Sequence, residues 1–504
     1  MPYVQVFTVT DLKQSTLSSS DIGVDLNPVF HVVGWNVAVL GLLMVVPAAT
    51  DFVDQHNDWQ VFAASSVTTT FFGALLILAT KSNGFRLGIH QAFILTVFVW
   101  LASAIVGAVP LAFSQLDLTY ADSFFEAMSG ITTTGSTILV GLDFLPPGIL
   151  LWRSILQGVG GIGFIATGIA LLPILKVGGM QLFRLESSER SEKIVPQAKR
   201  FVAFIVGIYV VLILACTLFY DLAGMTIFEA VCHALATVST GGYSTSDASL
   251  GHFDNPAIDL ACVVFMLAGS IPFILYIRAL QGRPERLLRD AQVRGYLKFL
   301  ALVVLGLTVW LCLERDEQIF PALRHAMLNV VSIATTTGFA SGDYSLWGEP
   351  VIAVFFFLTF VGGCSGSTAG GLKAFRFDML ALAFSIYVRR LVYPHGTFVA
   401  NYNGRRIGDD VFAGVLMFMG VYLLTVAVIS VVLALCGLDF ITSISGAATA
   451  VSNVGPGLGA SIGPAGNFAS LPEAAKWILS FAMLLGRLEF FTVLALLTPG
   501  FWRR

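Results

Sequence analysis

The sequence contains few charged side chains. Asp, Glu, Lys and Arg make up only 12% of its 504 residues, about half of the roughly 25% that is usual in a soluble domain. So few charges could not cover the surface of a water-soluble enzyme of this length. The net charge of −3 argues against a nucleic-acid binder, and the 56% of apolar residues exclude a disordered chain. We therefore expect an all-α polytopic membrane protein.

The usual signatures of catalysis and cofactor binding are also missing. The six cysteines show no CxxC spacing, which predicts buried free thiols. The chain has no GxGxxG after a strand, no P-loop, and no HExxH or GxSxG motif. We expect no enzyme and no covalent cofactor, so any response to nucleotides must come from a partner protein. The first 27 residues do not read as a secretory signal peptide.

Ten long apolar runs are present instead, and they predict ten membrane crossings. They cover residues 32–50, 59–80, 91–115, 146–175, 201–220, 260–277, 299–313, 351–372, 411–438 and 477–497. An even number of crossings places both termini on one side. Most of the lysines and arginines, including Lys373 and Arg376, then fall in loops on that same side. By the positive-inside rule, this side is the cytoplasm.

The most informative feature is a fourfold internal repeat. The stretches 129–137, 236–244, 332–340 and 449–457 resemble one another and align a glycine in each. The segments before them, 122–132, 226–238, 321–333 and 439–450, are too short to span a bilayer. They could be external loop helices. We favour four half-helices that dip into the membrane around one pore, because non-helical backbone at that depth must line a cavity or be buried.

Each glycine stretch offers the same uncharged chemistry. Backbone carbonyls and hydroxyls can replace the hydration shell of an alkali cation, and glycine permits the backbone dihedrals that turn carbonyls toward an axis. The half-helices would point the negative ends of their dipoles at the ion. The predicted ion-binding filter consists of Thr133, Thr134, Gly135, Thr240, Gly241, Gly242, Thr336, Thr337, Gly338, Asn453, Val454 and Gly455.

The four repeats resemble those of the TrkH/TrkG/KtrB superfamily of potassium transporters, and the stretches 152–164, 362–376 and 483–489 agree with this. The resemblance covers nearly the whole chain. The extra N-terminal pair of spans is more similar to the TrkH branch than to the shorter KtrB branch. The resemblance implies a single-chain pseudo-tetramer of helix–pore helix–filter–helix repeats with K⁺ as the metal ion at the filter residues. It also implies a homodimer in the lipid of the inner membrane, and a cytoplasmic nucleotide-binding regulator of the TrkA type.

The expected organisation follows the repeats. Residues 1–88 form an N-terminal region with two extra transmembrane helices. Pore repeats 1 to 4 are expected at 89–196, 197–294, 295–404 and 405–504, with an intramembrane gating loop in the third.

Five glycines between 362 and 371 predict that the last span of the third repeat is unwound, since each costs a helix about 1 kcal/mol. The alternative is a small-residue interface between helices. The resemblance implies a gate made of Gly362, Gly363, Ser365, Gly366, Ser367, Thr368, Gly370, Gly371 and Arg487. Arg487, two residues from Glu489, would be an electrostatic barrier, an internal ion pair, or both.

Other polar residues in the apolar segments receive structural interpretations. Arg153 is expected to snorkel from the outer end of its span. Counting nine residues back from each aligned glycine gives Glu126, His233, Asn329 and Gly446, which should lie on the pore helices behind the filter.

The function expected from the repeats and the resemblance is potassium uptake through a central filter. Only one glycine is shared by all four stretches, and Ser136 and Pro456 stand where potassium channels have an aromatic residue. We therefore expect looser discrimination between alkali ions than in a potassium channel. In the family, serine at the first-repeat glycine accompanies sodium permeation, so Gly135 favours K⁺. The alternative is a proton- or sodium-coupled secondary transporter, because broken helices suit that class too.

Overall fold

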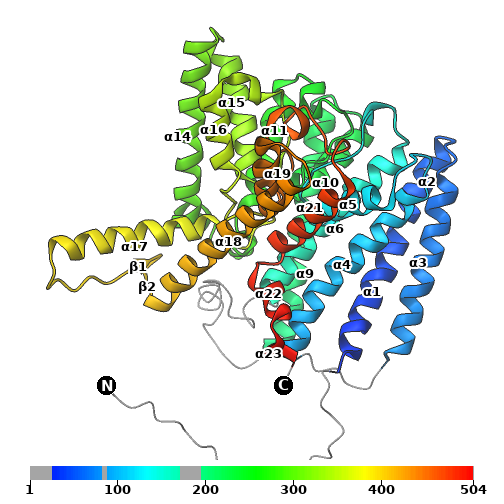
Figure 1. The fold of residues 1–504 in the computed structure, drawn as a ribbon, viewed down its shortest axis with the longest axis horizontal. Helices are drawn as coiled ribbons and strands as arrows, with labels where there is room; N and C mark the ends of the chain where they lie inside the picture. The colour runs from blue at the N-terminus through cyan, green and yellow to red at the C-terminus, as the bar shows by residue number, and fades with distance from the viewer. Residues whose placement is uncertain (1–24, 82–87, 171–193, 503–504) are drawn as a thin grey trace, which may run out of the picture.

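The chain folds almost entirely into helices. The computed structural model describes residues 25–81, 88–170 and 194–502 (Figure 1). Within those residues the strands that pair into a sheet are β1 (Asn401–Tyr402) and β2 (Arg405–Arg406), a short antiparallel hairpin. The expectation of an all-α protein is therefore confirmed.

The N-terminal region is a helical hairpin beside the rest of the protein (Figure 1). Its helices are α1 (Asn27–Leu43), α2 (Val45–Val53) and α3 (Trp59–Ala79). Asp51 ties this hairpin to the next part of the chain, because its buried carboxylate accepts a hydrogen bond of 2.6 Å from the backbone N–H of Gly148.

The stretches expected to form the first two repeats contain their elements in the same order. The first contains α4 (Ile89–Ala112), α5 (Tyr120–Ile131), η1 (Leu142–Phe144) and α6 (Pro147–Ala170). The second contains α9 (Ile194–Leu222), α10 (Ile227–Val238), η2 (Ser249–His252), α11 (Pro256–Ser270), α12 (Phe273–Leu280) and α13 (Glu285–Arg289).

The last two repeats complete the chain. The third contains α14 (Ala291–Glu314), α15 (Ile319–Ala334), η3 (Tyr344–Trp347), α16 (Glu349–Leu358) and α17 (Ala374–Val392), which projects from the body in Figure 1 and leads to the β1–β2 hairpin. The fourth contains α18 (Asp409–Leu435), α19 (Phe440–Ser452), α20 (Gly459–Ile462), α21 (Glu473–Arg487), α22 (Phe491–Leu497) and α23 (Pro499–Trp502).

The ten predicted spans are not ten straight helices. Among the described residues seven helices are long and apolar enough to cross a membrane, or eight if α11 and α12, which meet at a bend of 92°, count as one. The predicted span 351–372 stops being helical after Leu358, and the predicted span 477–497 is interrupted between Arg487 and Phe491. The glycines between 362 and 371 predict the first break, whereas the second falls at Arg487–Glu489, inside a run that hydropathy treats as one span.

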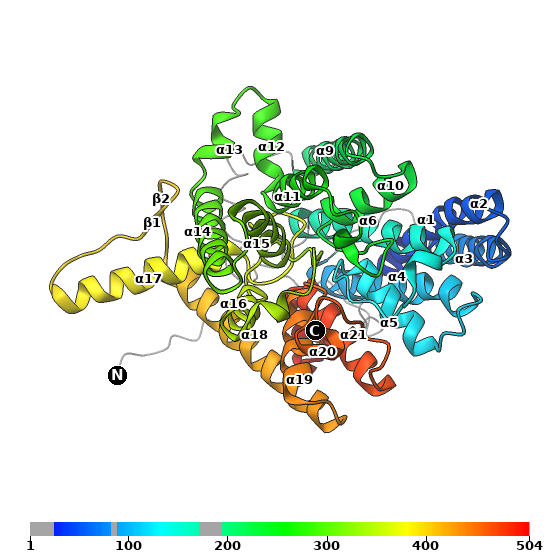
Figure 2. The same ribbon diagram turned by 90° about the horizontal axis from the view of Figure 1, so that it is seen from above.

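The repeats succeed one another around a centre, which is seen from above in Figure 2. Helix α6 of the first repeat contacts α10 of the second, α11 contacts α15 of the third, and α21 of the fourth returns to α5 of the first. The centre they enclose is where the four short helices α5, α10, α15 and α19 end.

Small residues allow the N-terminal hairpin to close. Gly73 on α3 faces the backbone of Ala38 on α1, and a Cβ built on Gly73 would lie 2.5 Å from the Ala38 nitrogen. Gly41 likewise leaves room for Thr70. Backbones that approach this closely are typical of helix pairs in membranes, where van der Waals packing replaces the hydrophobic effect.

Replacing Gly73 by valine should therefore destabilise the fold. The new side chain must push α1 from α3, and overpacking of this kind costs about 1–3 kcal/mol. We expect the detergent-solubilised Gly73→Val protein to lose its size-exclusion peak at a temperature several degrees below wild type. Gly306→Val on α14 is the matched control, since a Cβ there meets nothing within 4 Å. Equal shifts for both variants would contradict the packing argument.

Candidate functional site

The four short helices have sequence-encoded starts. Thr119 and Thr226 cap α5 and α10 in capping boxes with Asp122 and Glu229, which satisfies the free N–H groups of the first turn. Asp439 caps α19, and the hydrogen bonds it accepts from Thr442 hold the pKa of this exposed carboxyl below its ordinary value. The described chain shows no side-chain cap for α15, which begins after Gln318.

The same backbone motif ends all four helices. The predicted filter has three positions in each repeat, and the first is occupied by Thr133, Thr240, Thr336 and Asn453. These residues adopt left-handed φ values of 52°, 54°, 59° and 56°. The N–H of the first position donates to the carbonyl three residues earlier, and the N–H of the second to the carbonyl five residues earlier. This is a Schellman motif, which normally has glycine or asparagine at the left-handed position.

Threonine at that position is strained. A β-branched residue with positive φ is a genuine outlier, and strain of this kind concentrates at functional sites. The glycines at the third position also have positive φ, from 79° in Gly242 to 111° in Gly455. In an extended strand successive carbonyls point to opposite sides. Left-handed residues at the first and third positions break this alternation, so that successive carbonyls turn toward the same side.

The four glycines complete a closed ring. A Cβ built on any of them would fall within 3.0 Å of a carbonyl oxygen at the second position of the next repeat. Gly135 faces the carbonyl of Gly241, Gly242 that of Thr337, Gly338 that of Val454, and Gly455 that of Thr134. The predicted filter residues, which lie far apart in the sequence, are thus brought together around one axis.

The ring is chemically suited to a monovalent cation. It carries no formal charge, and the ends of four helix dipoles direct partial negative charge toward it. Two acceptor oxygens at the first position, Thr133 Oγ1 and Asn453 Oδ1, are buried without a hydrogen-bond partner among the described residues. Buried polar atoms without a partner destabilise the folded protein unless a ligand or a water molecule binds to them. Carbonyl and hydroxyl oxygens of this kind are the ligands that hard cations prefer.

Glu126, His233, Asn329 and Gly446 each lie nine residues before the aligned glycine of their repeat. Three of these four residues brace the chain that leaves the predicted filter. The carboxylate of Glu126 accepts hydrogen bonds from Thr137 Oγ1 (3.0 Å) and from the N–H of Ile138 (2.9 Å). His233 Nε2 lies 3.0 Å from Ser244 Oγ.

The other two positions differ in detail. Asn329 Nδ2 donates to Ser341 Oγ at 2.7 Å. Gly446 has no side chain, and the neighbouring Ser445 Oγ accepts from the N–H of Leu458 at 3.0 Å instead. The interpretation of these positions as structural therefore extends to a shared task, fixing the outgoing strand against its own pore helix.

Arg153 does not snorkel. Only 1% of its side chain is exposed, and its Nε donates to Glu126 at 2.7 Å. The remaining guanidinium N–H groups reach Thr137 Oγ1 and the carbonyl of Ser244, at 3.0 and 3.2 Å. The snorkelling prediction was wrong because a carboxylate buried on a different helix supplies the charge partner that the span itself lacks.

The glycine-rich segment of the third repeat forms a loop against the filter. Between α16 and α17 the chain is non-helical, and a parallel β-bridge between Val361 and Leu372 joins the two ends of the loop. Thr368 Oγ1 donates to the carbonyls of Val238 and Gly269 (3.1 and 2.9 Å). The N–H of Gly370 donates to Thr336 Oγ1, a first-position filter residue, at 2.6 Å. The unwound loop, rather than a helix–helix interface, is what the structure contains.

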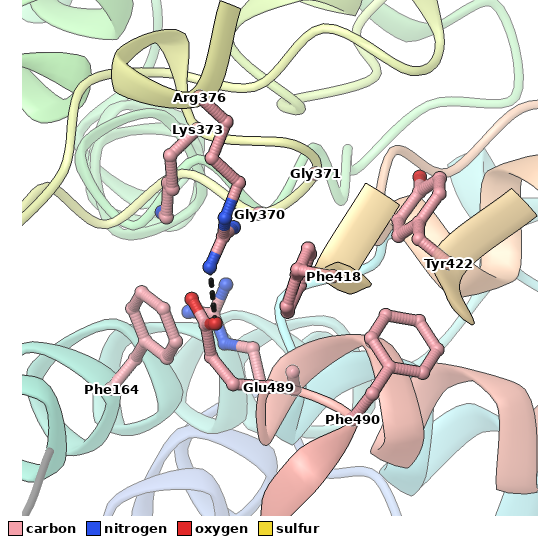
Figure 3. Close-up of a pocket in the computed structure, with 11 residues that line it drawn as sticks. Phe164, Gly370, Gly371, Lys373, Arg376, Phe418, Tyr422, Glu489 and Phe490 are labelled. Atoms are coloured by element: carbon pink, nitrogen blue, oxygen red, sulfur yellow. Dashed lines mark hydrogen bonds and ion pairs between the residues drawn. The ribbon is translucent and has the colours of Figure 1, made fainter. Parts of the chain in front are cut away.

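A buried cluster of charge lies beside this loop. Figure 3 shows Lys373, Arg376 and Glu489 around a small pocket that Phe164, Phe418 and Tyr422 also line, and Arg487 belongs to the same lining. Arg376 pairs with Glu489, and Arg487 Nη1 donates to the carbonyl of Thr368 at 3.0 Å. Glu489 therefore pairs with Arg376 and not with Arg487, contrary to the ion-pair interpretation of Arg487.

Lys373 and Arg376 were expected among the basic residues of the cytoplasmic loops, but their side chains are buried. Their side chains are only 3% and 2% exposed. The ring of Phe164 lies 4.8 Å from Lys373 Nζ, and the ring of Phe418 lies 3.5 Å from Arg376 Cζ. A count of charges along the sequence cannot show which lysines and arginines are stabilised by aromatic rings that pack against them in the fold.

One further residue behind the filter was missed. Gln157, on α6, is fully buried, and its side-chain Nε2 donates to the Gly241 carbonyl at 2.6 Å. A polar amide inside a long, mostly apolar span was the signal that could have found it.

The chain is similar to known proteins along most of its length. The model of the TrkH family, described as cation transport protein, matches residues 58–313 and 318–500. The Trk system potassium uptake protein TrkI of Halomonas elongata is 45% identical over 95% of this chain and 97% of its own length. The Trk system potassium uptake protein TrkH of Escherichia coli K12 is 35% identical over 94% of this chain and 98% of its own length.

A solved structure is similar throughout. The crystal structure of the potassium transporter TrkH from Vibrio parahaemolyticus superposes with a TM-score of 0.88 at 32% identity, covering 95% of this chain and 100% of that one. The matched proteins are transporters, not enzymes. With its apolar helices and these relatives, the protein is an integral membrane protein, and the chain belongs to the TrkH family of cation transport proteins.

Proposed function

We propose that this protein takes up K⁺ across the inner membrane through a pore whose filter is the ring of twelve residues predicted from the sequence. The observation that carries the proposal is the closed set of glycine–carbonyl approaches between successive repeats. An uncharged ring of carbonyls can substitute for the water around K⁺ without holding it too tightly to leave. The printed names of the relatives, which are potassium uptake proteins, support K⁺ as the transported ion.

The gate in this proposal is the loop beneath the filter, together with Arg487. Its small residues permit the tight packing against filter positions, and Arg487 adds positive charge on the permeation path. The proposed gate residues are Gly362, Gly363, Ser365, Gly366, Ser367, Thr368, Gly370, Gly371 and Arg487.

The assembly is proposed from the charge pattern and the family. The basic loops face the cytoplasm, which puts both termini there. The protein forms a homodimer and is controlled by a TrkA-type nucleotide-binding regulator, consistent with relatives named as parts of a Trk system. The repeat boundaries 89–196, 197–294, 295–404 and 405–504 belong to the same proposal, with α9 and α14 beginning three and four residues before the second and third repeats.

Flux measurements separate this function from coupled transport. Purified protein in liposomes should pass K⁺ in preference to Na⁺ when K⁺ alone drives the flux. Uptake that appears only with an imposed proton or sodium gradient would instead favour the coupled secondary transporter. If the isolated protein is silent, adding the regulator distinguishes a closed gate from a wrong assignment.

Substituting a filter glycine should reduce selectivity. Gly338 has a φ of 87°, and a Cβ there would collide with the carbonyl of Val454. Strain of about 1–3 kcal/mol in the ring corresponds to a loss of roughly tenfold in the K⁺/Na⁺ flux ratio of Gly338→Ser. Gly342→Ser, four residues along, is the control, because nothing lies within 4 Å of its Cβ position. A wild-type ratio in Gly338→Ser would count against the filter.

Neutralising Arg487 should increase flux. A unit charge about 10 Å from an ion changes its energy by about 2 kcal/mol at an effective dielectric constant of about 20. Arg487→Gln also weakens a hydrogen bond that holds the loop at Thr368. We expect roughly tenfold faster K⁺ flux in liposomes. The exposed Arg315 offers a matched control, and Arg315→Gln should leave the rate unchanged. Equal rates in wild type and Arg487→Gln would contradict the role of the charge.

A further inference from the structure

Helix α6 runs directly behind the filter strands of the first and second repeats. Gln157 projects from α6 toward the strand of the second repeat and has no exposed surface. Its Nε2 donates to the Gly241 carbonyl at 2.6 Å, and its Oε1 accepts from the N–H of Tyr243 at 3.1 Å. One side-chain amide thus binds the residues on both sides of the filter glycine Gly242.

The bond to Gly241 sets the second repeat apart. The carbonyls of Thr134, Thr337 and Val454 hold the equivalent position in the other repeats. Over the described part of the chain, none of those three receives a hydrogen bond, while Gly241 receives the one from Gln157. Among the four second-position carbonyls of the described chain, Gly241 is therefore the one with a side-chain hydrogen bond.

The identity of residue 241 follows from the same contact. The other repeats have Thr134, Thr337 and Val454 at this position, whereas the second has glycine. A Cβ on Gly241 would lie 2.5 Å from Gln157 Cδ. The glutamine side chain therefore occupies, from behind, the space that a side chain takes up in the other repeats.

The helix that carries Gln157 is firmly anchored. One turn earlier, Arg153 joins Glu126 and Thr137 of the first repeat to Ser244 of the second. The ring of Tyr243 lies 4.1 Å from the Arg153 guanidinium carbon. One turn later, Gly160 lets α6 approach the Ile131 carbonyl closely. Gln157 is held in place between these two contacts.

We propose that Gln157 is a specificity-determining residue, acting as a positioning group for the Gly241 carbonyl. Its amide holds one oxygen of the ring at a fixed distance from the axis and shares that oxygen with the permeating ion. A ring fixed in this way cannot contract around Na⁺, which is smaller than K⁺. The inference rests on the proposed function, since it assigns a role within the filter of that proposal.

The test compares Gln157→Met and Gln157→Leu with wild type in K⁺ and Na⁺ flux into liposomes. Both replacements fill similar space, and neither can donate a hydrogen bond to the Gly241 carbonyl. We expect the K⁺/Na⁺ ratio to fall about threefold to tenfold, the effect of losing one ordinary hydrogen bond. Ser154→Ala is the matched control on α6: the Ser154 hydroxyl donates to the Leu150 carbonyl of its own helix, so this variant should keep the wild-type ratio.

A double-variant comparison separates positioning from general damage. Gly241→Ala alone introduces a collision with the Gln157 amide and should lower the ratio. In the Gln157→Ala background the collision is gone, so the same change should have a much smaller additional effect. Unfolding would instead reduce total flux and thermal stability without this non-additive change in selectivity.

The possible outcomes are distinct. Lower ratios in both Gln157 variants, with non-additivity at Gly241, support the inference. A selective wild type with unchanged ratios in Gln157→Met and Gln157→Leu would overturn the inference and leave the proposed function standing. A wild type that passes Na⁺ as readily as K⁺ would overturn both.

Discussion

The architecture depends on how closely four backbone segments approach one axis. At each filter glycine the neighbouring repeat places a carbonyl oxygen where a Cβ would be, and the four approaches close into a ring. No residue with a side chain fits there without displacing the neighbour. Peptide groups at membrane depth must also have partners or line a polar path. The short helices α5, α10, α15 and α19, their left-handed ends and the strands that leave them are the means by which this chain satisfies both requirements.

The strain at the ring is supported from behind. Three of the four left-handed residues are threonines, which avoid this conformation in ordinary loops. Glu126, His233 and Asn329 hold the outgoing strands against their pore helices, so the backbone cannot relax outward. The supporting side chains differ from repeat to repeat although the backbone motif is the same. Different supporting side chains thus maintain the same backbone geometry in each repeat. The backbone itself requires only the aligned glycine, which is why a single glycine is common to all four repeats.

Sequence alone predicted the elements whose signal is local. The aligned glycines, the short helices before them and the glycine-rich break after α16 all follow from spacing and backbone preference. What it missed depends on contacts across the fold. Arg153 is neutralised by Glu126 from another helix, and Lys373 and Arg376 are stabilised by Phe164, Phe418 and Glu489. Counting basic residues assumes that they lie in loops, and it fails where such partners allow a charge to be buried.

The loop and the proposed filter are mechanically connected, and this connection constrains how the pore could open. The N–H of Gly370 donates to Thr336 Oγ1, while Thr133, at the same filter position in the first repeat, has an unpartnered hydroxyl among the described residues. Withdrawal of the loop would release the Thr336 oxygen to act as Thr133 does. The carbonyl of Thr368, held by Arg487, moves with the same segment. If this loop is the gate proposed above, its withdrawal would also free the Thr336 oxygen at the proposed filter. Gating and ion binding would then be coupled through a shared hydrogen bond rather than through a distant signal.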